Sequence, residues 1–387
     1  MTTEGDVGTR VLAVVGTRPE AIKMAPVIRA LELRAPHLET RLALTGQHTD
    51  LVDGALATFG LDPDWDLQIM KEDQSLTDVA RECLSGIGAV LKEWRPDLLL
   101  VQGDTGSAFY STMAAYFHRT WIGHVEAGLR TGDLRSPFPE EAFRRLIAVL
   151  ADLHFAPTHA ARKNLLREGV PDERIHVTGN TVVDALVDVA GRGVPPRSEV
   201  LARLLEKGAP PFVLLTLHRR ESFGPPIERA LESVTRLVAE VPDLEVIYPV
   251  HPNPNVTEPV RRLLGDRERI HLIPPLSYPD LVAALRGARA VLTDSGGIQE
   301  EAPSFGTPVL VLRDKSERPE GLDAGVARLV GTDPARIVDE AKTLLARGAA
   351  ERDGFGASNP YGDGRAGARI ASIVERFLRE RGKGEQE

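Results

Sequence analysis

The chain has 387 residues, of which 42% are hydrophobic and 27% charged, a balance typical of a soluble globular protein with two domains of ordinary size. Its formal net charge is −9 and no block of lysine and arginine stands out, so we expect no nucleic-acid partner. An acidic protein can still bind a diphosphate through a few well-placed basic residues.

Cysteine content and hydropathy indicate the cellular setting. Cys83 is the single cysteine, which excludes an intramolecular disulfide and a cysteine-based metal site and fits a reducing cytoplasm. The N-terminal segment carries acidic residues and one brief apolar run, which predicts a first strand rather than a signal peptide. No stretch reaches the ~20 apolar residues of a membrane span, so we expect a cytoplasmic protein without membrane association.

Short apolar runs alternate with longer helical patterns in the first half of the chain. A helix is predicted from about Pro19 to Leu33, and strands are predicted at residues 11–16, 41–46, 97–104, 121–128 and 151–157. The run DLLLVQGD (97–104) is apolar until its final Gly-Asp, which is typical of a buried parallel strand. The segment from about residue 187 to 211 is rich in glycine and proline and lacks a strand pattern. We interpret GRGVPPRS (191–198) as the centre of a linker.

The same alternation restarts after this segment. Strands are predicted at residues 212–218, 244–251, 269–275, 288–294 and 307–314, and an amphipathic helix at 365–381. Such alternation predicts parallel sheets with right-handed crossovers. We therefore expect an α/β protein with two Rossmann-like, doubly wound domains, residues 1–187 and 188–364, followed by a C-terminal helix. Open α/β sheets bind ligands at the carboxyl ends of their strands, so we expect a cleft between the domains.

Several common motifs are missing. The first predicted strand ends in VGTRPE, with a single glycine, so neither GxGxxG nor GxxxxGK[ST] occurs there and no nicotinamide or P-loop nucleotide is supported. The histidines lack metal-ligand spacing such as HExxH, and no GxSxG elbow supports Ser-His-Asp catalysis. We predict no metal site.

Charged residues stand at predicted strand ends in the first half. VGTRPEAIKMAP (15–26) puts Arg18 at a strand-to-helix turn and Lys23 one turn into the helix, two cations that suit an anionic ligand. Asp104 and Glu126 each end a predicted strand, and Glu140 begins a predicted helix. Three carboxylates at one edge of a sheet indicate acid–base chemistry.

Structural roles stay open for some of these acids. Asp104 could be a helix N-cap, and Glu140 and Glu141 follow Pro139 at a helix start, where the helix dipole favours acids in any case. Glu126 is followed by Ala-Gly and has no capping role.

Two histidines end predicted strands of the second half. His218 ends FVLLTLH (212–218) and His251 ends LEVIYPVH (244–251). A lone histidine at such a place is more often structural than catalytic, so neither pattern decides a role.

The strongest local signal is DSGG (294–297) at the start of a predicted helix. Ser295, Gly296 and Gly297 are expected to offer backbone N–H groups to a phosphate, helped by the helix dipole. Glu301, further along the same helix, can accept two ribose hydroxyls, and Arg318 in SERPE would add a cation. A simple helix cap is the alternative. The combination predicts a site for a nucleoside diphosphate.

At these residues the sequence resembles the non-hydrolysing UDP-N-acetylglucosamine 2-epimerases. The matching motifs run through nearly the whole chain in one order: GTRPEAIKMAP, GQH, GDT, HVEAGLRTGD, SPFPEE, LHRRES, DSGGIQEEAP, ERPE and NPYGDG. The resemblance implies two domains arranged as in GT-B glycosyltransferases, with the C-terminal helix (365–387) packed on the first domain. It also implies that the protein is usually a homodimer and has no redox cofactor. It implies a UDP-sugar substrate, UDP-N-acetylglucosamine by default, although related enzymes act on diacetamido uronate analogues.

The resemblance also implies roles for the residues described above. Asp104, Glu126 and Glu140 match the family's catalytic acids, and His218 matches its histidine near the diphosphate. Arg18 and Lys23 match basic residues of the active site, and five residues match nucleotide contacts: Ser295, Gly296, Gly297, Glu301 and Arg318. The implied reaction removes the C2 proton as UDP leaves C1, forms 2-acetamidoglucal, and adds UDP back with a proton on the other face.

Some family members bind a second UDP-sugar as an activator, and Gln47, His48 and His251 match that site. Asp50 and Asp73 replace a glutamine and an arginine there, which predicts weak or absent regulation. Three other functions stay open: a GT-B glycosyltransferase, a hydrolysing epimerase and a catalytically silent sugar-nucleotide sensor.

Overall fold

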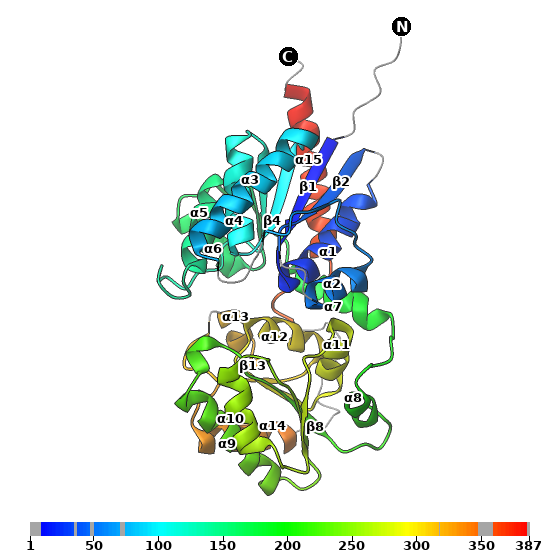
Figure 1. The fold of residues 1–387 in the computed structure, drawn as a ribbon, viewed down its shortest axis with the longest axis vertical. Coiled ribbons are helices and arrows are strands. Elements are labelled where there is room, and N and C mark those ends of the chain that lie inside the picture. Colours follow the sequence, from blue (N-terminus) through cyan, green and yellow to red (C-terminus); the bar gives the residue numbers. More distant parts are fainter. Residues whose placement is uncertain are drawn as a thin grey trace. The chain divides into compact units, whose positions relative to one another are not determined.

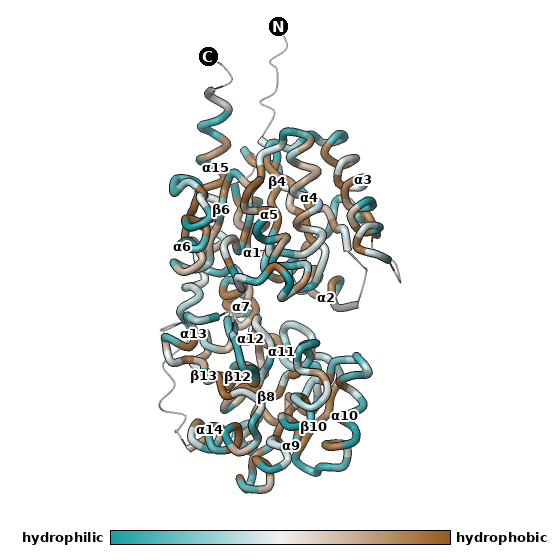
Figure 2. Tube along the Cα trace, turned by 90° about the vertical axis from the view of Figure 1, so that its left-hand side faces the viewer, coloured by the Kyte–Doolittle hydropathy of each residue, from teal (hydrophilic) through white to brown (hydrophobic). Residues whose placement is uncertain are grey.

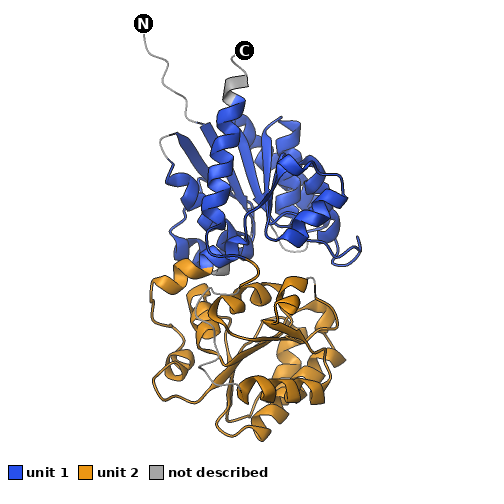
Figure 3. Ribbon diagram, turned by 180° about the vertical axis from the view of Figure 1, so that it is seen from behind, with its two compact units in different colours: residues 1–185, 362–387 blue, residues 186–361 orange. Residues whose placement is uncertain are grey.

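The computed structural model of the chain describes residues 9–34, 37–46, 50–69, 74–316, 318–346 and 359–384. It divides into two compact units (Figure 3): unit 1 comprises residues 1–185 and 362–387, and unit 2 comprises residues 186–361. The division falls inside helix α7 (Thr181–Gly191). The sequence placed the boundary two residues later, at 187/188, and interpreted the segment up to residue 211 as a linker.

Unit 1 contains a seven-stranded parallel sheet in the order β3-β2-β1-β4-β5-β6-β7. The strands are β1 (Thr9–Val15), β2 (Leu38–Leu44), β3 (Trp65–Asp66), β4 (Leu98–Gln102), β5 (Trp121–Val125), β6 (Leu153–Ala156) and β7 (Ile175–Val177). Every residue of β4 is buried, as an internal parallel strand with helices on both faces requires.

Helices cover both faces of this sheet. They are α1 (Arg18–Glu32), α2 (Asp50–Phe59), α3 (Leu76–Trp94), α4 (Gly106–Phe117), α5 (Glu140–Leu150), α6 (His159–Arg167), a short 3-10 turn η1 (Asp172–Arg174), α7 and α15 (Ala366–Gly384). Helices α3, α4 and α5 lie side by side on one face and α1 with α15 on the other (Figure 1). Ile87, Phe109 and Ile147, one from each of α3, α4 and α5, pack on the strand residues Leu12 and Val101.

Unit 2 repeats the plan with six parallel strands in the order β10-β9-β8-β11-β12-β13. The strands are β8 (Phe212–Thr216), β9 (Glu245–Pro249), β10 (Ile270–Ile273), β11 (Ala290–Thr293), β12 (Val309–Val311) and β13 (Ala327–Leu329). The helices are α8 (Glu199–Leu204), α9 (Pro225–Glu240), α10 (Pro254–Leu264), α11 (Tyr278–Gly287), α12 (Gly296–Glu301), α13 (Pro319–Asp323) and α14 (Pro334–Ala346), with 3-10 turns η2 (Arg220–Ser222) and η3 (Ala302–Phe305). In both units hydrophobic segments concentrate in the interior (Figure 2).

The prediction of two doubly wound, Rossmann-like α/β units is confirmed. The predicted strands are present; β1 and β2 begin two or three residues earlier than predicted, and the others are shorter than predicted. Strands β3, β7 and β13 were not predicted. These three strands have two or three residues each, too few for an apolar period to stand out. The interpretation of residues 187–211 as linker needs correction, because α7 continues to Gly191 and α8 follows.

The strand order places a topological switch point in each sheet. In unit 1 the chain passes from β1 to β2 on one side of β1 and later adds β4 on the other side. In unit 2 it passes from β8 to β9 on one side of β8 and later adds β11 on the other side. Connections diverge at such a point and leave a crevice outside the carboxyl ends of the strands, where open α/β sheets bind ligands. Arg18 and Asp104 follow β1 and β4, and His218 and Ser295 follow β8 and β11.

Candidate functional site

The turn after β1 carries the two predicted cations. Arg18 is the first residue of α1, with Thr17 as the N-cap, and Lys23 lies on the buried face of the same helix. Lys23 Nζ is 2.5 Å from Glu126 Oε1. Glu20, between them, is buried, and its carboxylate accepts hydrogen bonds from the backbone N–H of Gly16 and the hydroxyl of Thr105. The turn is therefore bonded to the connections that follow β4 and β5.

Glu126 follows β5 and is only 9% exposed, in a left-handed backbone conformation with φ of 64°. Its Oε1 accepts from Lys23 Nζ and, at 3.0 Å, from Asn180 Nδ2, and its Oε2 accepts from Gln102 Nε2. A buried carboxylate needs such partners, because desolvation disfavours an unpaired charge. Three donors from separate segments of the chain fix this side chain at the carboxyl edge of the sheet.

Asp104 follows β4 and forms an ion pair with Arg144 of α5. Arg144 Nη2 lies 2.5 Å from Asp104 Oδ2. The same guanidinium reaches the fully buried Glu141, whose carboxylate accepts from the backbone N–H groups of Thr131 and Gly132. Asp104 therefore connects through Arg144 to the loop before α5. The N-cap role left open for Asp104 is wrong, because the cap of α4 is Thr105, whose hydroxyl accepts from Ala108 N.

Glu140 is the first residue of α5, where the helix dipole favours a carboxylate. Its Oε2 atom is buried and has no hydrogen-bond partner among the described residues. Its neighbour Glu141 is fully bonded, so the two adjacent acids have different surroundings. Glu140 is the one with unused hydrogen-bonding capacity.

A buried histidine supports the turn before Asp104. His124 of β5 places Nε2 at 2.7 Å from the carbonyl oxygen of Gly103, so this nitrogen carries the proton and donates. Burial lowers the pKa of His124 to about 4, which keeps the ring neutral near pH 7. An added Cβ at Gly103 would lie 3.9 Å from Glu126 Oε2, so the β4 and β5 turns are in contact.

In unit 2, α12 begins at Gly296 after the turn that follows β11. Its first N–H groups lack partners within the helix, as at any helix start. The N–H of Ser295, which was expected to bind phosphate, instead donates to Thr293 Oγ1 at 2.9 Å. The cradle expected from Ser295, Gly296 and Gly297 therefore cannot use that N–H. The Ser295 side chain makes no cap hydrogen bond, which argues against the alternative of a simple cap.

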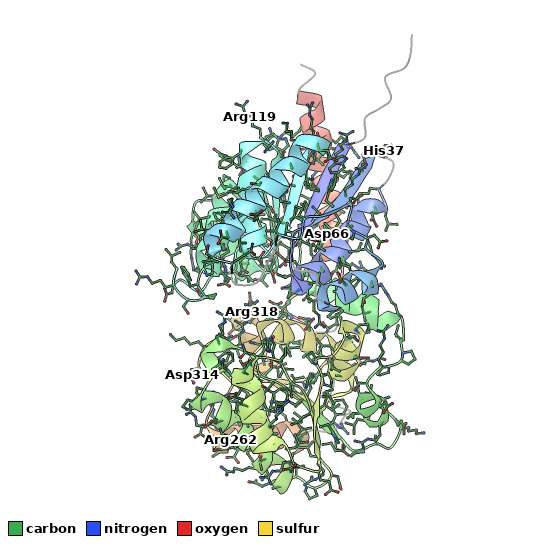
Figure 4. All side chains as sticks on the ribbon, viewed as in Figure 1. His37, Asp66, Arg119, Arg262, Asp314 and Arg318 are labelled. Carbon is green, nitrogen blue, oxygen red and sulfur yellow. The ribbon has the colours of Figure 1, made fainter. Side chains whose placement is uncertain are left out.

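Two arginines lie beside Gly296. A Cβ added there would come within 3.1 Å of Arg219 Nη2 and 3.4 Å of Arg318 Cζ. Arg318 Nε also donates to Glu300 Oε1 at 2.8 Å, which orients its guanidinium. Figure 4 shows Arg318 at the edge of unit 2 that carries α12 and α13. Two cations beside a glycine helix start suit a diphosphate.

Glu301, the expected ribose ligand, ends α12 and is 6% exposed. It lies at the C-terminal end of the same helix, five residues beyond Gly296. The sequence analysis named Glu301 as a candidate but not its neighbour Glu300, which forms an ion pair with Arg318.

His218 lies at the switch point of the second sheet. The backbone N–H groups of His218 and Arg219 donate to the buried carboxylate of Asp294, and His218 Nδ1 is 3.8 Å from Asp294 Oδ1. Burial lowers the pKa of His218, against an opposing, smaller effect of Asp294. Its ring stacks on His251 with centroids 5.9 Å apart. Of the three residues matched to an activator site, Gln47 and His48 lie outside the described residues, so His251 alone can be placed.

Sequence reasoning missed the residues that hold these groups in place. They are Glu20, Gln102, Arg144, Asn180, Arg219, Asp294 and Glu300. Asp294 offered a signal, because it is an acid directly after an apolar strand, as Asp104 is. Glu20 and Asn180 offered none, since Thr105 and Glu126, to which they connect these turns, are distant in sequence. Within the described residues, His, Cys, Asp and Glu side chains form no metal-binding group, and no helix is long and apolar enough to span a membrane.

Comparisons with known proteins point to one family. A family model described as UDP-N-acetylglucosamine 2-epimerase matches residues 30–375. The UDP-N-acetylglucosamine 2-epimerase of Salmonella typhimurium is 48% identical over 375 residues, covering 95% of this chain and 99% of the relative. The enzyme of that name from Bacillus subtilis is 46% identical over 369 residues, 95% of each chain.

Solved structures agree as well. A UDP-GlcNAc 2-epimerase from Neisseria meningitidis, bound to UDP-GlcNAc, superposes with a TM-score of 0.87 at 40% identity and covers 96% of this chain and 100% of its own. A glycosyltransferase from Rickettsia africae reaches a TM-score of 0.56 at 12% identity over 97% of each chain, a likeness in fold alone that agrees with the expected GT-B-like architecture. The resemblance noted from the motifs is thus confirmed. The chain belongs to the UDP-N-acetylglucosamine 2-epimerase family.

Proposed function

We propose that this protein interconverts UDP-N-acetylglucosamine and UDP-N-acetylmannosamine by inverting C2, through elimination and readdition of UDP. Family membership supports the substrate class. The observation that carries the proposal is the placement of three carboxylates in unit 1: Asp104 and Glu126 directly follow β4 and β5, and Glu140 begins α5. A transferase that only moves a sugar to an acceptor has no need of three acids there.

The proposed chemistry has two steps. A carboxylate takes the C2 proton while the C1–O bond breaks and its electron pair leaves with UDP, which forms the C1–C2 double bond of 2-acetamidoglucal. UDP then adds back at C1 while a proton reaches C2 from the opposite face. Two faces require two proton-transfer groups, and we assign this work to Asp104, Glu126 and Glu140.

We assign the nucleotide to unit 2. Backbone N–H groups at Gly296 and Gly297 and the guanidinium of Arg318 would bind the diphosphate, with Arg219 beside them. His218 would act at the leaving phosphate, and Glu301 would accept the ribose hydroxyls. In unit 1, Arg18 would supply positive charge. Lys23, expected to bind substrate, instead has Glu126 as a partner, so we propose that it acts through that carboxylate.

A proton NMR time course in deuterium oxide with UDP-N-acetylglucosamine as the sole sugar tests the reaction. We expect signals of UDP-N-acetylmannosamine with deuterium at C2 and no free sugar. Accumulation of free sugar and UDP would indicate a hydrolysing epimerase, and no turnover without an acceptor would favour a glycosyltransferase. Product that keeps its original C2 proton would exclude solvent-exchanging bases.

Amide variants test the three acids. Asp104→Asn, Glu126→Gln and Glu140→Gln should each lower the epimerisation rate by about 100-fold or more, because the amide keeps the shape and removes the base. Affinity for UDP, measured by calorimetry, should stay close to that of the unchanged protein. Glu173→Gln, on the exposed turn η1, is the matched control and should keep full activity. A full rate in any one of the three variants would remove that residue from the mechanism.

We also propose that the protein is a homodimer and, from its sequence, cytoplasmic. The neighbouring helices α4 and α5 expose Tyr116, Phe117, Leu146 and Val149, with 47–78% of each residue accessible. An apolar patch of this kind indicates a protein interface. Light scattering should give twice the chain mass, and Phe117→Glu with Val149→Glu should give one chain mass. Leu205→Glu, at an exposed position directly after α8, should not change the mass.

A further inference from the structure

The two turns at the switch point of unit 1 are cross-linked by a side chain to which the proposed reaction gives no role. One turn, Gly16 to Arg18, follows β1 and carries a predicted substrate cation. The other, Gly103 to Thr105, follows β4 and contains Asp104. Glu20 lies under both turns and is 2% exposed.

The carboxylate of Glu20 is fully engaged. Its Oε2 accepts from Gly16 N at 2.9 Å and its Oε1 accepts from Thr105 Oγ1 at 2.5 Å. It also receives hydrogen bonds from the backbone and side chain of Thr17. The Thr105 hydroxyl in turn accepts from Ala108 N at 3.1 Å, so it joins Glu20 to the first turn of α4. Burial raises the pKa of Glu20, against the smaller lowering effect of these bonds.

The surrounding packing leaves these turns little freedom. A Cβ added at Gly16 would lie 2.2 Å from Ser107 Oγ, and one added at Gly46 would lie 1.8 Å from the carbonyl oxygen of Gly16. The Thr45 hydroxyl donates to Ser107 Oγ at 2.8 Å. Glycine is therefore required at both positions, because the turns after β1 and β2 are in backbone contact and the Ser107 side chain of α4 packs on Gly16. Glu20 adds a directional link to a junction that is already tightly packed.

We propose that Glu20 is a positioning residue that, through the Thr105 hydroxyl, fixes Asp104 relative to the Arg18 turn. This inference rests on the proposed epimerase function. Glu20 is not placed among the catalytic residues, because its oxygens are taken by Gly16, Thr17 and Thr105. A displacement on the order of 1 Å in a reacting group can lower a rate by about 100-fold, so a link that sets this distance affects turnover directly.

The test changes the link at Thr105 and compares turnover with binding and stability. Thr105→Val removes the hydroxyl, and we expect kcat to fall by about 10- to 100-fold with the Kd for UDP within about twofold. Thr105→Ser keeps a hydroxyl and should restore kcat to within about threefold. Thr158→Val is the control for the lost helix cap, because Thr158 caps α6 through the same 3.1 Å contact. It should lower stability through the lost cap and leave kcat unchanged.

Glu20→Gln separates positioning from proton transfer. The glutamine oxygen can accept from Gly16 N while its amide donates to the Thr105 hydroxyl, so the link survives without the acid. We expect kcat within about threefold and an unchanged pH profile. A loss of 100-fold or more with an altered pH profile would overturn the inference, because Glu20 would then act as an acid or base. A folded Thr105→Val variant with full kcat would overturn it as well.

The outcomes also separate this inference from the function on which it rests. The unchanged protein is assayed first, and absence of epimerisation there refutes the proposed function and the inference together. Epimerisation by the unchanged protein with equal kcat in Thr105→Val and Thr158→Val refutes the inference alone.

Discussion

At the scale of single residues, the pairing of Lys23 with Glu126 governs both stability and chemistry. Both side chains are nearly buried, at 11% and 6% exposure, so each charge depends on the other to offset its desolvation. Asn180 and Gln102 contribute neutral hydrogen bonds and cannot replace the ammonium. The carboxylate proposed to move a proton is thus part of a buried ion pair, and its environment depends on the cation.

Removing the cation of this ion pair should destabilise the protein. Lys23→Met should lower the free energy of unfolding by about 3 kcal/mol, because it leaves a buried carboxylate without its cation. The double variant Lys23→Met with Glu126→Gln should regain part of that loss in urea unfolding while remaining inactive. Arg379→Met, which breaks an exposed pair with Glu375, should change stability by less than about 1 kcal/mol. Equal losses from Lys23→Met and the double variant would contradict the pairing argument.

At the scale of elements, α15 joins unit 1 through a contact between helix backbones. Asp184 of α7 accepts from the N–H groups of Ala366 and Gly367, at 3.1 and 2.8 Å, and so caps the start of α15. A Cβ on Gly367 would lie 2.6 Å from the carbonyl oxygen of Pro26 in α1. Glycine at this position lets the two helices approach closely.

Gly367→Ala should therefore separate α15 from α1. We expect the free energy of unfolding to fall by about 1–3 kcal/mol, the usual effect of overpacking. Gly88→Ala in α3 is the matched control, because its nearest neighbour, His118 Nε2, lies at 3.6 Å and leaves room for the methyl group. It should stabilise by up to about 1 kcal/mol through helix propensity. Urea unfolding of both variants measures the contrast, and a Gly367→Ala variant as stable as Gly88→Ala would argue against the close contact.

At the scale of the whole molecule, acid stability depends on two histidines paired across β5 and β6. His124 and His154 are 1% exposed, and burial lowers their pKa values to about 4 and about 3. The unfolded chain, with a histidine pKa near 6.5, takes up protons first as pH falls. Stability should therefore decrease below about pH 6.5, by about 1.4 kcal/mol per pH unit for each histidine.

A variant isolates this contribution. Burial raises the pKa of Asp184 to about 6, so this carboxyl stabilises the folded protein as pH falls from that value toward its unfolded pKa. Because this effect opposes that of the histidines, the total slope of stability against pH cannot be assigned to the histidines alone. His154→Leu should reduce the slope by about 1.4 kcal/mol per pH unit between about pH 6 and pH 4. Leu165→Ala, which removes no titratable group, should shift the whole curve down without changing its slope. Urea unfolding across this range measures both, and an unchanged slope in His154→Leu would refute the assignment.

The sequence by itself determined the two doubly wound units and most strands within them. Apolar runs and their period depend on neighbouring residues, so they can be recognised locally. The same logic located Asp104, Glu126 and the DSGG turn at strand ends. Motifs in a single order along the chain determined the family.

The tertiary structure alone decided how these residues are held. Lys23 and Glu126 are 103 positions apart, and Asp104 pairs with Arg144 of another helix instead of capping its own. No local sequence pattern predicts such pairs, because they depend on which connections the strand order brings to one edge of the sheet. The short strands β3, β7 and β13 likewise form because a neighbouring strand offers hydrogen bonds, and Glu20 links two turns because β1 and β4 are adjacent.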